Sequence, residues 1–251
     1  MVSILFQSML TIFSHFYNEE YLLPWWLEHH KKIASHGIMI DYDSTDKSVE
    51  IIKDICPTWE IIKTKNGMFQ HIDCDNEVRD LERLYQGYKL ALNTTEFLVG
   101  NLQASLQYTP ESLNIKSYVM CDKFHHLPCY PEYSVPLVDQ CHHGFFKTAY
   151  RPSRVMHRKS TYDYTPGRHS YEIDTELLAV CWYGWAPWNE HTMQRKLQIG
   201  PRIPKEQLVL GHGRQHDCDI NLLTQQFEYH ASISYDLGPM IRMLQSYGKG
   251  E

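Results

Sequence analysis

Two clusters of acidic and polar residues near the start of the chain could recognise a nucleotide. One covers residues 41–46 (DYDSTD), and the other covers residues 15–20 (HFYNEE). Carboxylate and amide oxygens accept hydrogen bonds from the imide of a uracil ring and from ribose hydroxyls. The candidate nucleotide-binding residues are therefore Asn18, Glu19, Asp41 and Asp43. A simpler alternative is that Asp46 caps a helix and the other two aspartates are solvated loop acids.

A carboxylate late in the chain could act as a general base. Glu190 opens a predicted helix, and Arg195 and Lys196 follow about one turn later. A carboxylate in this position can take the proton of a hydroxyl group while that hydroxyl attacks a sugar carbon. The nearby tryptophans suit a bound sugar, although one or two of them could serve the core instead: Trp182, Trp185 and Trp188. In the alternative interpretation, Glu190 only complements the helix dipole.

Basic and histidine-rich segments in the second half could bind phosphate. The best candidates are residues 167–169 (GRH) and 212–214 (HGR), because a neighbouring glycine lets the backbone approach a phosphate closely. The candidate phosphate-binding residues are Arg168, His169, His212 and Arg214. Cysteines and histidines between residues 121 and 143 have the spacing C-x3-HH-x2-C-x11-CHH, which matches no common zinc module. We therefore predict no metal ligands among them.

Strands and helices are expected to alternate through the first 104 residues. Strands are predicted at 10–15, 37–41, 59–64 and 96–100, with helices starting near Leu22 and Asp46 and a third helix at 77–92. This order predicts an α/β fold with a mostly parallel sheet flanked by helices. Because parallel strands end at the same edge of a sheet, residues 15–20 and 41–46 should meet across a crevice.

The rest of the chain is less regular. Prolines and aromatic residues dominate beyond about residue 104, and one later helix is predicted at 189–199. No linker separates two domains. We expect a single domain over residues 1–251, with a nucleotide-binding half up to about residue 104 and an acceptor-binding and catalytic half from about residue 105.

Composition narrows the class of protein. A net charge of −6 leaves no broad basic field for nucleic acid or an anionic membrane. Seven cysteines, none spaced CxxC, are typical of reduced thiols in the cytoplasm. No apolar run approaches the ~18 residues of a membrane span, and residues 1–16 lack the basic start and cleavage site of a signal peptide. A cytoplasmic protein without a nucleic-acid partner or membrane span is expected.

Several blocks of the sequence resemble one enzyme family. The stretch HFYNEEYLLPWWLEHHKKIASHGIMIDYDSTDKSVEIIK resembles the N-terminal signature of family-2-like glycosyltransferases of the GT-A fold. The fragments KTAYRPSRVMH, TPGRH and WYGWAPWNEHTMQRKLQI resemble later blocks, so the resemblance covers roughly residues 10–216. This group is frequent in bacteria and in large DNA viruses, and a viral protein would act in the host cytoplasm. The resemblance implies a GT-A-like (Rossmann-like) fold in which Asp41 and Asp43 contact the nucleotide of a sugar donor, although the family more often has His in place of Asp43.

The same resemblance implies an inverting reaction. Inverting enzymes of this fold often have their base at the second residue of a Glu-Asp pair that starts a comparable helix, and Asn189-Glu190 occupies that place. We therefore predict that Glu190 is the base in a single-displacement transfer from a nucleotide-sugar donor to a glycan hydroxyl. A UDP-sugar is the expected donor, and UDP-xylose is one candidate.

One departure from the family concerns the metal. Relatives usually carry an Asp-x-Asp motif, followed by Glu and apolar residues, that holds Mn²⁺ or Mg²⁺ on the donor diphosphate. Placed just after the predicted strand 96–100, the motif would coincide with Asn101-Leu102-Gln103. Hard divalent ions need anionic oxygen ligands, so we expect Asn101 and Gln103 to face the donor without a metal.

Three alternatives to a metal-independent transferase remain open at this stage. The acids could lie in another register, in which case Mn²⁺ or Mg²⁺ would be the cofactor. The chain could be a non-catalytic nucleotide- or glycan-binding protein derived from the same fold. A glycoside hydrolase that uses two carboxylates is less favoured, because the N-terminal motifs indicate a nucleotide crevice.

Overall fold

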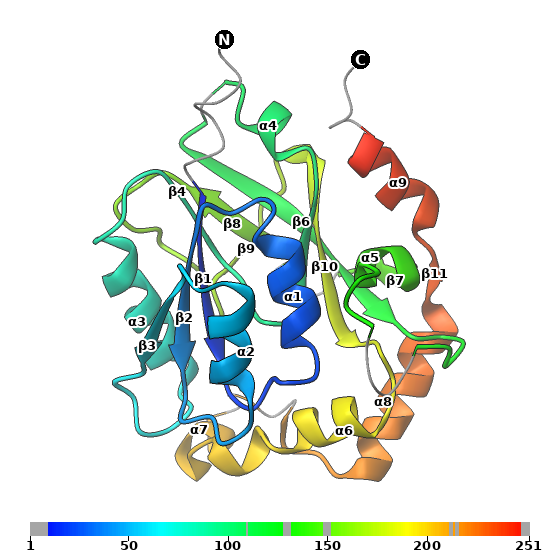
Figure 1. The fold of residues 1–251 in the computed structure, drawn as a ribbon. Helices are drawn as coiled ribbons and strands as arrows, with labels where there is room; N and C mark the ends of the chain where they lie inside the picture. Colours follow the sequence, from blue (N-terminus) through cyan, green and yellow to red (C-terminus); the bar gives the residue numbers. More distant parts are fainter. Residues whose placement is uncertain are drawn as a thin grey trace.

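The computed structural model describes residues 10–108, 110–127, 132–147, 152–210, 213 and 216–246. Its first half contains four parallel strands in the order β3-β2-β1-β4 (Figure 1). These strands are β1 (Leu10–Phe16), β2 (His36–Asp41), β3 (Glu60–Lys63) and β4 (Tyr88–Ala91). The helices between them are α1 (Leu23–His30), α2 (Ser48–Ile55) and α3 (His71–Glu82).

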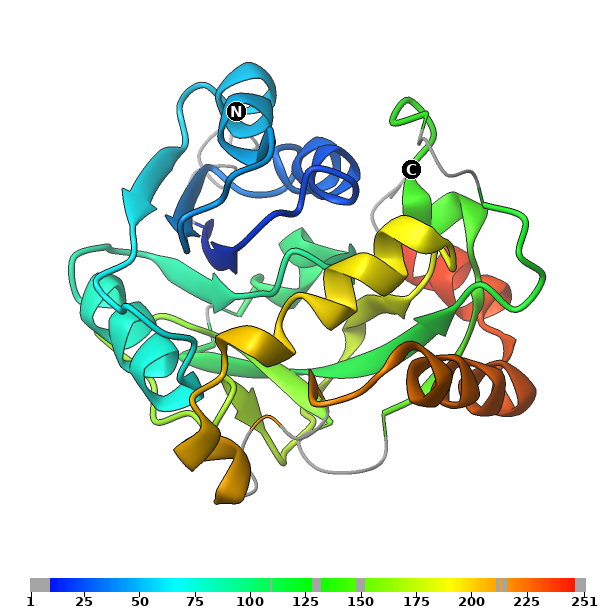
Figure 2. The same ribbon diagram turned by 90° about the horizontal axis from the view of Figure 1, so that it is seen from below.

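Alternation of side chains along the strands explains why helices cover both faces of this sheet. In β1, Ile12 belongs to the apolar cluster that contains Trp26 of α1, whereas the next residue, Phe13, belongs to the cluster that contains Val78 of α3. Successive side chains of a strand point to opposite faces. Figure 2 shows α1 and α2 on one side of β1 and β2, with α3 on the other.

The second half extends the sheet with mainly antiparallel strands. They are β5 (Glu96–Gly100), β6 (Ser112–Cys121), β7 (His143–Phe146), β8 (Ser153–His157), β9 (His169–Ser170), β10 (Thr175–Trp185) and β11 (Tyr235–Asp236). The sheet continues from β4 through β8, β6 and β7 to β11, while β10 pairs in parallel with β6 and antiparallel with β5. The remaining helices are α4 (Leu102–Ser105), α5 (Leu137–Gln140), α6 (Glu190–Leu197), the 3-10 helix η1 (Gly200–Arg202), α7 (Lys205–Val209), α8 (Ile220–Ile233) and α9 (Gly238–Ser246).

The predicted α/β fold, with a largely parallel central sheet flanked by helices, is confirmed. The helix predicted at 77–92 is wrong in its second half. The helix ends at Glu82, Gly87 adopts a positive φ of 83°, and β4 follows immediately. Glycine adopts this left-handed conformation at no steric cost, here in the turn just before β4.

The pairings also fix the direction of β5. β4 is antiparallel to β8, β8 is antiparallel to β6, and β6 is parallel to β10, which is antiparallel to β5. β5 therefore runs opposite to β4. Its carboxyl end lies at the edge of the sheet where β1, β2 and β4 begin.

In the described part of the chain, no helix combines the length and the apolar character needed to cross a membrane.

Candidate functional site

A cavity of about 180 Å³ lies at the carboxyl ends of β1, β2 and β4. Its walls come from the segments that follow these strands, from α3, and from the segment that runs from α6 through η1 (lower part of Figure 1). Ligands of open α/β sheets bind at this edge. The lining residues are His15, Phe16, Tyr17, Glu19, Tyr42, Phe69, Cys74, Asn93, Thr94, Thr95, Arg168, Trp182, Arg195, Lys196, Ile199, Arg202 and His216.

The two polar clusters predicted to meet across a crevice do meet. The Asn18 side-chain oxygen accepts a hydrogen bond from the Thr45 backbone N–H at 2.8 Å, and Asn18 adopts a left-handed φ of 50°. The Glu19 backbone N–H donates to the Ser48 hydroxyl at 2.9 Å. These bonds hold the segment after β1 against the segment after β2, so that Glu19 lines the cavity.

Three of the predicted nucleotide-binding residues lie beside the cavity lining. Asp41 accepts a hydrogen bond from the Ser44 backbone N–H at 2.9 Å, which closes a local turn. Asp43, at a φ of 63°, is exposed and forms an ion pair with Lys63 at 2.7 Å. Asn18 bridges the two segments as described. Of residues 41–46, Tyr42 is the one that lines the cavity. Contact of these three side chains with a nucleotide stays a prediction.

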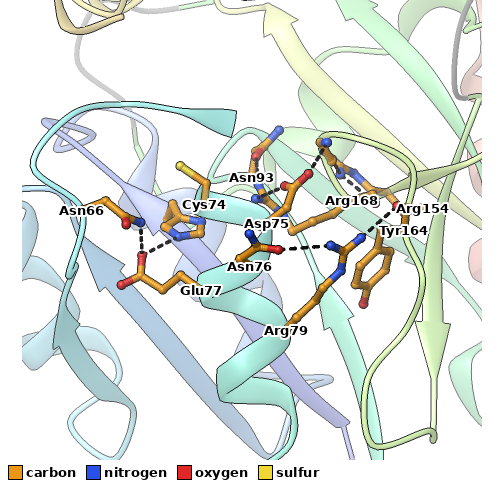
Figure 3. A network of polar contacts seen from close by, with 12 residues as sticks. Asn66, Cys74, Asp75, Asn76, Glu77, Arg79, Asn93, Arg154, Tyr164 and Arg168 are labelled. Atoms are coloured by element: carbon orange, nitrogen blue, oxygen red, sulfur yellow. Dashed lines mark hydrogen bonds and ion pairs between the residues drawn. The ribbon is translucent and has the colours of Figure 1, made fainter. Parts of the chain in front are cut away.

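Arg168 is held in the cavity wall by a preorganised loop (Figure 3). The guanidinium of Arg154 donates to the carbonyls of Gly167 and Arg168, at 2.5 and 3.0 Å, and Asp75 accepts from the Gly167 N–H. Gly167 and Arg168 both have positive φ values, 84° and 60°. In this conformation the buried Arg168 side chain donates to Asp75 at 3.0 Å and to the Asn93 side-chain oxygen at 3.2 Å.

Of the four strong bases in the cavity wall, two form ion pairs with carboxylates and two do not. Arg168 is paired with Asp75, and Arg195 is paired with Glu19. Lys196 and Arg202 have no carboxylate partner among the described residues. No carboxylate of the described part of the protein therefore compensates either side chain when it is protonated, which suits an anionic ligand.

Aromatic rings support these two unpaired cations. The Arg202 guanidinium lies 3.8 Å from the centroid of the Tyr17 ring, and it donates to the Tyr42 carbonyl at 2.9 Å. The Lys196 ammonium lies 3.7 Å from the centroid of the Trp185 ring. Ring faces stabilise a cation without neutralising its charge.

A buried imidazole also faces the cavity. His15 contacts Glu77 at 3.3 Å, and burial lowers the pKa of His15 to about 4, so this ring is neutral at physiological pH. Glu77 in turn accepts a hydrogen bond from the Asn66 side chain (Figure 3) and another from the Thr64 hydroxyl. These contacts fix the wall between β1 and α3.

The position assigned to the missing acidic pair has to be corrected. Asn101 follows β5, whose carboxyl end lies at the edge opposite the cavity, and its side chain caps α4 by accepting from the Ala104 N–H at 2.9 Å. Gln103 is exposed on the same short helix (top of Figure 1). Neither residue lines the cavity, so neither can face a donor bound there.

The segment at the position of the acidic pair is instead Asn93-Thr94-Thr95, which directly follows β4 and lies in the cavity wall. The relatives' pattern of Asp-x-Asp followed by Glu and an apolar residue coincides with Asn93, Thr95, Glu96 and Phe97. This match was the signal that sequence reasoning missed. The corrected register still contains no carboxylate at the two motif positions, so these residues do not fit a divalent ion. Across the described ranges, no group of three or more His, Cys, Asp or Glu residues is arranged to hold a metal.

Glu190 lies outside the cavity lining. It is the first residue of α6, after Asn189, whose side chain caps the helix by accepting from the Thr192 N–H at 3.2 Å. The Glu190 side chain is exposed and accepts a hydrogen bond from Gln194 at 3.0 Å. The geometry therefore matches the alternative in which Glu190 complements the helix dipole. Glu19 is the only carboxylate of the described residues that lines the cavity.

The remaining predicted residues divide between the cavity, the core and the undescribed segments. Trp182 lines the cavity, whereas Trp188 stacks on Phe227 at 4.2 Å in a buried cluster that also contains Trp185. His169 lies in β9, where its Nδ1–H donates to the Ser153 carbonyl at 3.2 Å, and it does not line the cavity. Sequence reasoning missed Arg202, Tyr17 and Tyr42. His212, Arg214 and Cys129 lie outside the described residues.

No protein-family model matches the chain, and no curated protein matches it significantly. Among solved structures, residues 1–349 of S. aureus TarS give a TM-score of 0.38 at 11% identity, over 77% of this chain and 65% of that one. TarS 1–349 in complex with UDP-GlcNAc gives 0.33 at 13% identity, over 44% and 35%. Glucosyl-3-phosphoglycerate synthase of Mycobacterium tuberculosis, in complex with Mn²⁺, UDP and glucosyl-3-phosphoglycerate, gives 0.33 at 11% identity, over 45% and 44%.

Both solved proteins have the GT-A-like glycosyltransferase fold that the sequence resemblance implies. This chain spans less than two thirds of the length of each of these structures. The ligands in these structures are those of the solved proteins alone.

Proposed function

We propose that this protein is a glycosyltransferase that moves a sugar from a UDP-sugar to a glycan hydroxyl without a divalent metal. The observation that supports the proposal is the cavity at the carboxyl ends of β1, β2 and β4, in which Lys196 and Arg202 lack carboxylate partners among the described residues and the motif positions Asn93 and Thr95 are uncharged. A nucleotide-sugar donor carries a diphosphate, and fixed cations beside it can stabilise that charge.

The chemistry of transfer accounts for this arrangement. Negative charge builds on the departing diphosphate as the bond to the sugar breaks, and preorganised positive groups lower the energy of that transition state. Arg168 and Arg195 are held in place by their carboxylate partners, while Lys196 and Arg202 supply the uncompensated charge. Trp182, in the same wall, offers a ring face for the sugar.

The function is tested by measuring binding and turnover separately. Thermal-shift measurements against UDP-glucose, UDP-GlcNAc, UDP-xylose and GDP-mannose should show one donor that raises the melting temperature, because a ligand that binds only the native state stabilises it. The same donor should release its nucleotide when acceptor glycans are added. Binding without nucleotide release would favour a non-catalytic binding protein, and no stabilisation by any nucleotide sugar would reject the transferase.

A variant of Glu190 tests whether this residue is the general base of an inverting transfer. Because its side chain is exposed and outside the cavity lining, we expect Glu190→Gln to leave the transfer rate within about threefold of the wild type, whereas removal of a true general base costs about 10²–10⁴. Glu19→Gln serves as the comparison, with its melting temperature measured alongside to separate loss of rate from loss of fold. It removes the charge that holds Arg195 and, in the folded fraction, should lower the rate by more than Glu190→Gln does. A Glu190→Gln loss in the range of 10²–10⁴ would restore Glu190 as the base.

A further inference from the structure

Lys196 is placed unusually for a lysine. It lies near the carboxyl end of α6 and lines the cavity, with its ammonium 3.7 Å from the centroid of the Trp185 ring and 5.6 Å from that of Trp182. The preceding residue, Arg195, forms an ion pair with Glu19. Among the described residues no carboxylate lies within ion-pair distance of Lys196. In the described part of the chain, ring faces therefore support its charge.

Among the described residues, the titratable groups that interact directly with Lys196 carry no negative charge near neutral pH. Arg195 precedes it on α6, His216 and Cys218 lie in the segment before α8, and His230 lies on α8. Burial lowers the pKa of both His216 and His230 to about 4, and burial raises the pKa of the Cys218 thiol. Burial of the ammonium, followed by the charge of Arg195, lowers the pKa of Lys196 to about 7.

We propose that Lys196 is a proton-coupled phosphate site, whose amine exchanges between neutral and charged forms in the free protein and becomes fixed as an ammonium ion when the donor diphosphate binds. The inference rests on the proposed function, because it takes a nucleotide sugar as the ligand. A phosphate anion within a few ångströms favours the charged form of the amine through direct attraction. One proton then enters the complex from solvent together with the donor.

Coupling of donor binding to proton uptake by Lys196 predicts weaker donor binding above neutral pH. Below about pH 7 Lys196 is already protonated in the free protein, so donor affinity does not depend on its titration. Above that pH the free amine is neutral, and each donor that binds must bring in a proton. The dissociation constant should therefore rise about tenfold per pH unit above neutrality, which equals the cost of protonating the amine over that interval.

Isothermal titration calorimetry with the nucleotide sugar found in the thermal-shift screen tests the coupling. A nucleotide sugar is the suitable probe because its phosphates do not titrate near neutrality, unlike the terminal phosphate of a free nucleoside diphosphate. At pH 8, in buffers with different ionisation enthalpies, we expect the wild type to take up close to one proton per donor, and at pH 6 almost none. Lys196→Arg should bind with no proton uptake at either pH, because arginine stays charged.

Two further variants complete the test. Lys196→Met should bind at least about tenfold more weakly at pH 6, the loss expected for one hydrogen bond to a charged group, and should show no pH dependence. His216→Gln should keep the proton uptake of the wild type. Binding without proton uptake at pH 8, or uptake that persists in Lys196→Arg, would overturn the Lys196 inference while leaving the transferase proposal intact. Absence of binding by every nucleotide sugar would overturn both.

Discussion

The double variant Lys196→Met/Arg202→Met is expected to lower the kcat/KM of transfer by about 10²–10⁴, because each charge-assisted hydrogen bond to a phosphate contributes about 1.5–3 kcal/mol. These are the two cations of the cavity wall without carboxylate partners in the described residues. Their removal leaves no buried carboxylate unpaired. The melting temperature without ligand should therefore change little, and the loss of activity can be attributed to the site.

Arg168 and Arg195 would be poorer choices for the same experiment. Each is paired with a largely buried carboxylate, Asp75 or Glu19. Removing one partner of such a pair typically costs about 3–5 kcal/mol of stability, so reduced activity would be confounded with unfolding. Lys205→Met is the matched control, since it removes an exposed cation from α7, close in the chain to Arg202. Activity of the double variant within tenfold of the Lys205→Met control would reject phosphate binding by these two cations.

The first three strands could be predicted from the sequence because local signals agree there. Apolar runs end in polar clusters, and the order of strand and helix places Asn18 and Ser44–Asp46 at one edge of the sheet, where the structure shows them bonded. Parallel strands share an edge whatever the side chains are, so this part of the site follows from topology alone.

The fourth strand could not be predicted because its apolar residues continue a helical spacing. Val78, Leu81, Tyr85 and Tyr88 fit one helical stripe, although the helix ends at Glu82 and Tyr88 begins β4. Because β4 is not predicted from the sequence, the strand at residues 96–100, which is β5, is assigned the role of the fourth parallel strand. The acidic-pair position was then shifted by eight residues, from Asn93 to Asn101, and moved to the opposite edge of the sheet.

The cationic wall depends on contacts between residues far apart in sequence. Arg202 stacks on Tyr17, and Arg168 reaches Asp75 and Asn93 only because its loop is pinned by Arg154. No local pattern encodes such contacts. Lys196 and Arg168 could be suspected from their residue type, but which of the cations are paired with a carboxylate, and which are left for a ligand, follows only from the three-dimensional structure.

Installing carboxylates at Asn93 and Thr95 should turn the cavity into a metal site. Both residues line the cavity: the Asn93 oxygen accepts from Arg168 at 3.2 Å, and the Thr95 hydroxyl accepts from the Trp182 indole N–H at 3.1 Å. Divalent cations take anionic oxygen ligands. We therefore expect Asn93→Asp/Thr95→Asp to bind Mn²⁺, with a stabilisation of about 2.7 kcal/mol when free Mn²⁺ is 100 times its dissociation constant. Thermal shift with and without Mn²⁺ measures this effect.

In the Asn93→Asp/Thr95→Asp variant, stabilisation of the donor diphosphate should depend on Mn²⁺ instead of on fixed cations alone. Wild-type transfer should proceed unchanged in excess EDTA, because no step of the proposed reaction uses a metal. In EDTA the two new carboxylates oppose the donor diphosphate, so transfer by the variant should fall at least about tenfold, the effect of one lost or opposed charge contact. Added Mn²⁺ should restore it, since the ion would bridge the carboxylates and the diphosphate.

A second double variant decides between the two registers. Asn101→Asp/Gln103→Asp adds the same two charges at the edge of the sheet opposite the cavity, so it should gain neither Mn²⁺ binding nor sensitivity to EDTA. If Thr95→Asp, at a buried position, prevents folding, Asn93→Asp alone still provides one carboxylate beside the donor and should show a smaller Mn²⁺ effect. Wild-type activity that is lost in EDTA and recovered with Mn²⁺ would reject metal-independent transfer. Transfer that becomes dependent on Mn²⁺ in the Asn101/Gln103 variant, but not in the Asn93/Thr95 variant, would reject the corrected register, because a metal held beside α4 could not reach a diphosphate bound in the cavity.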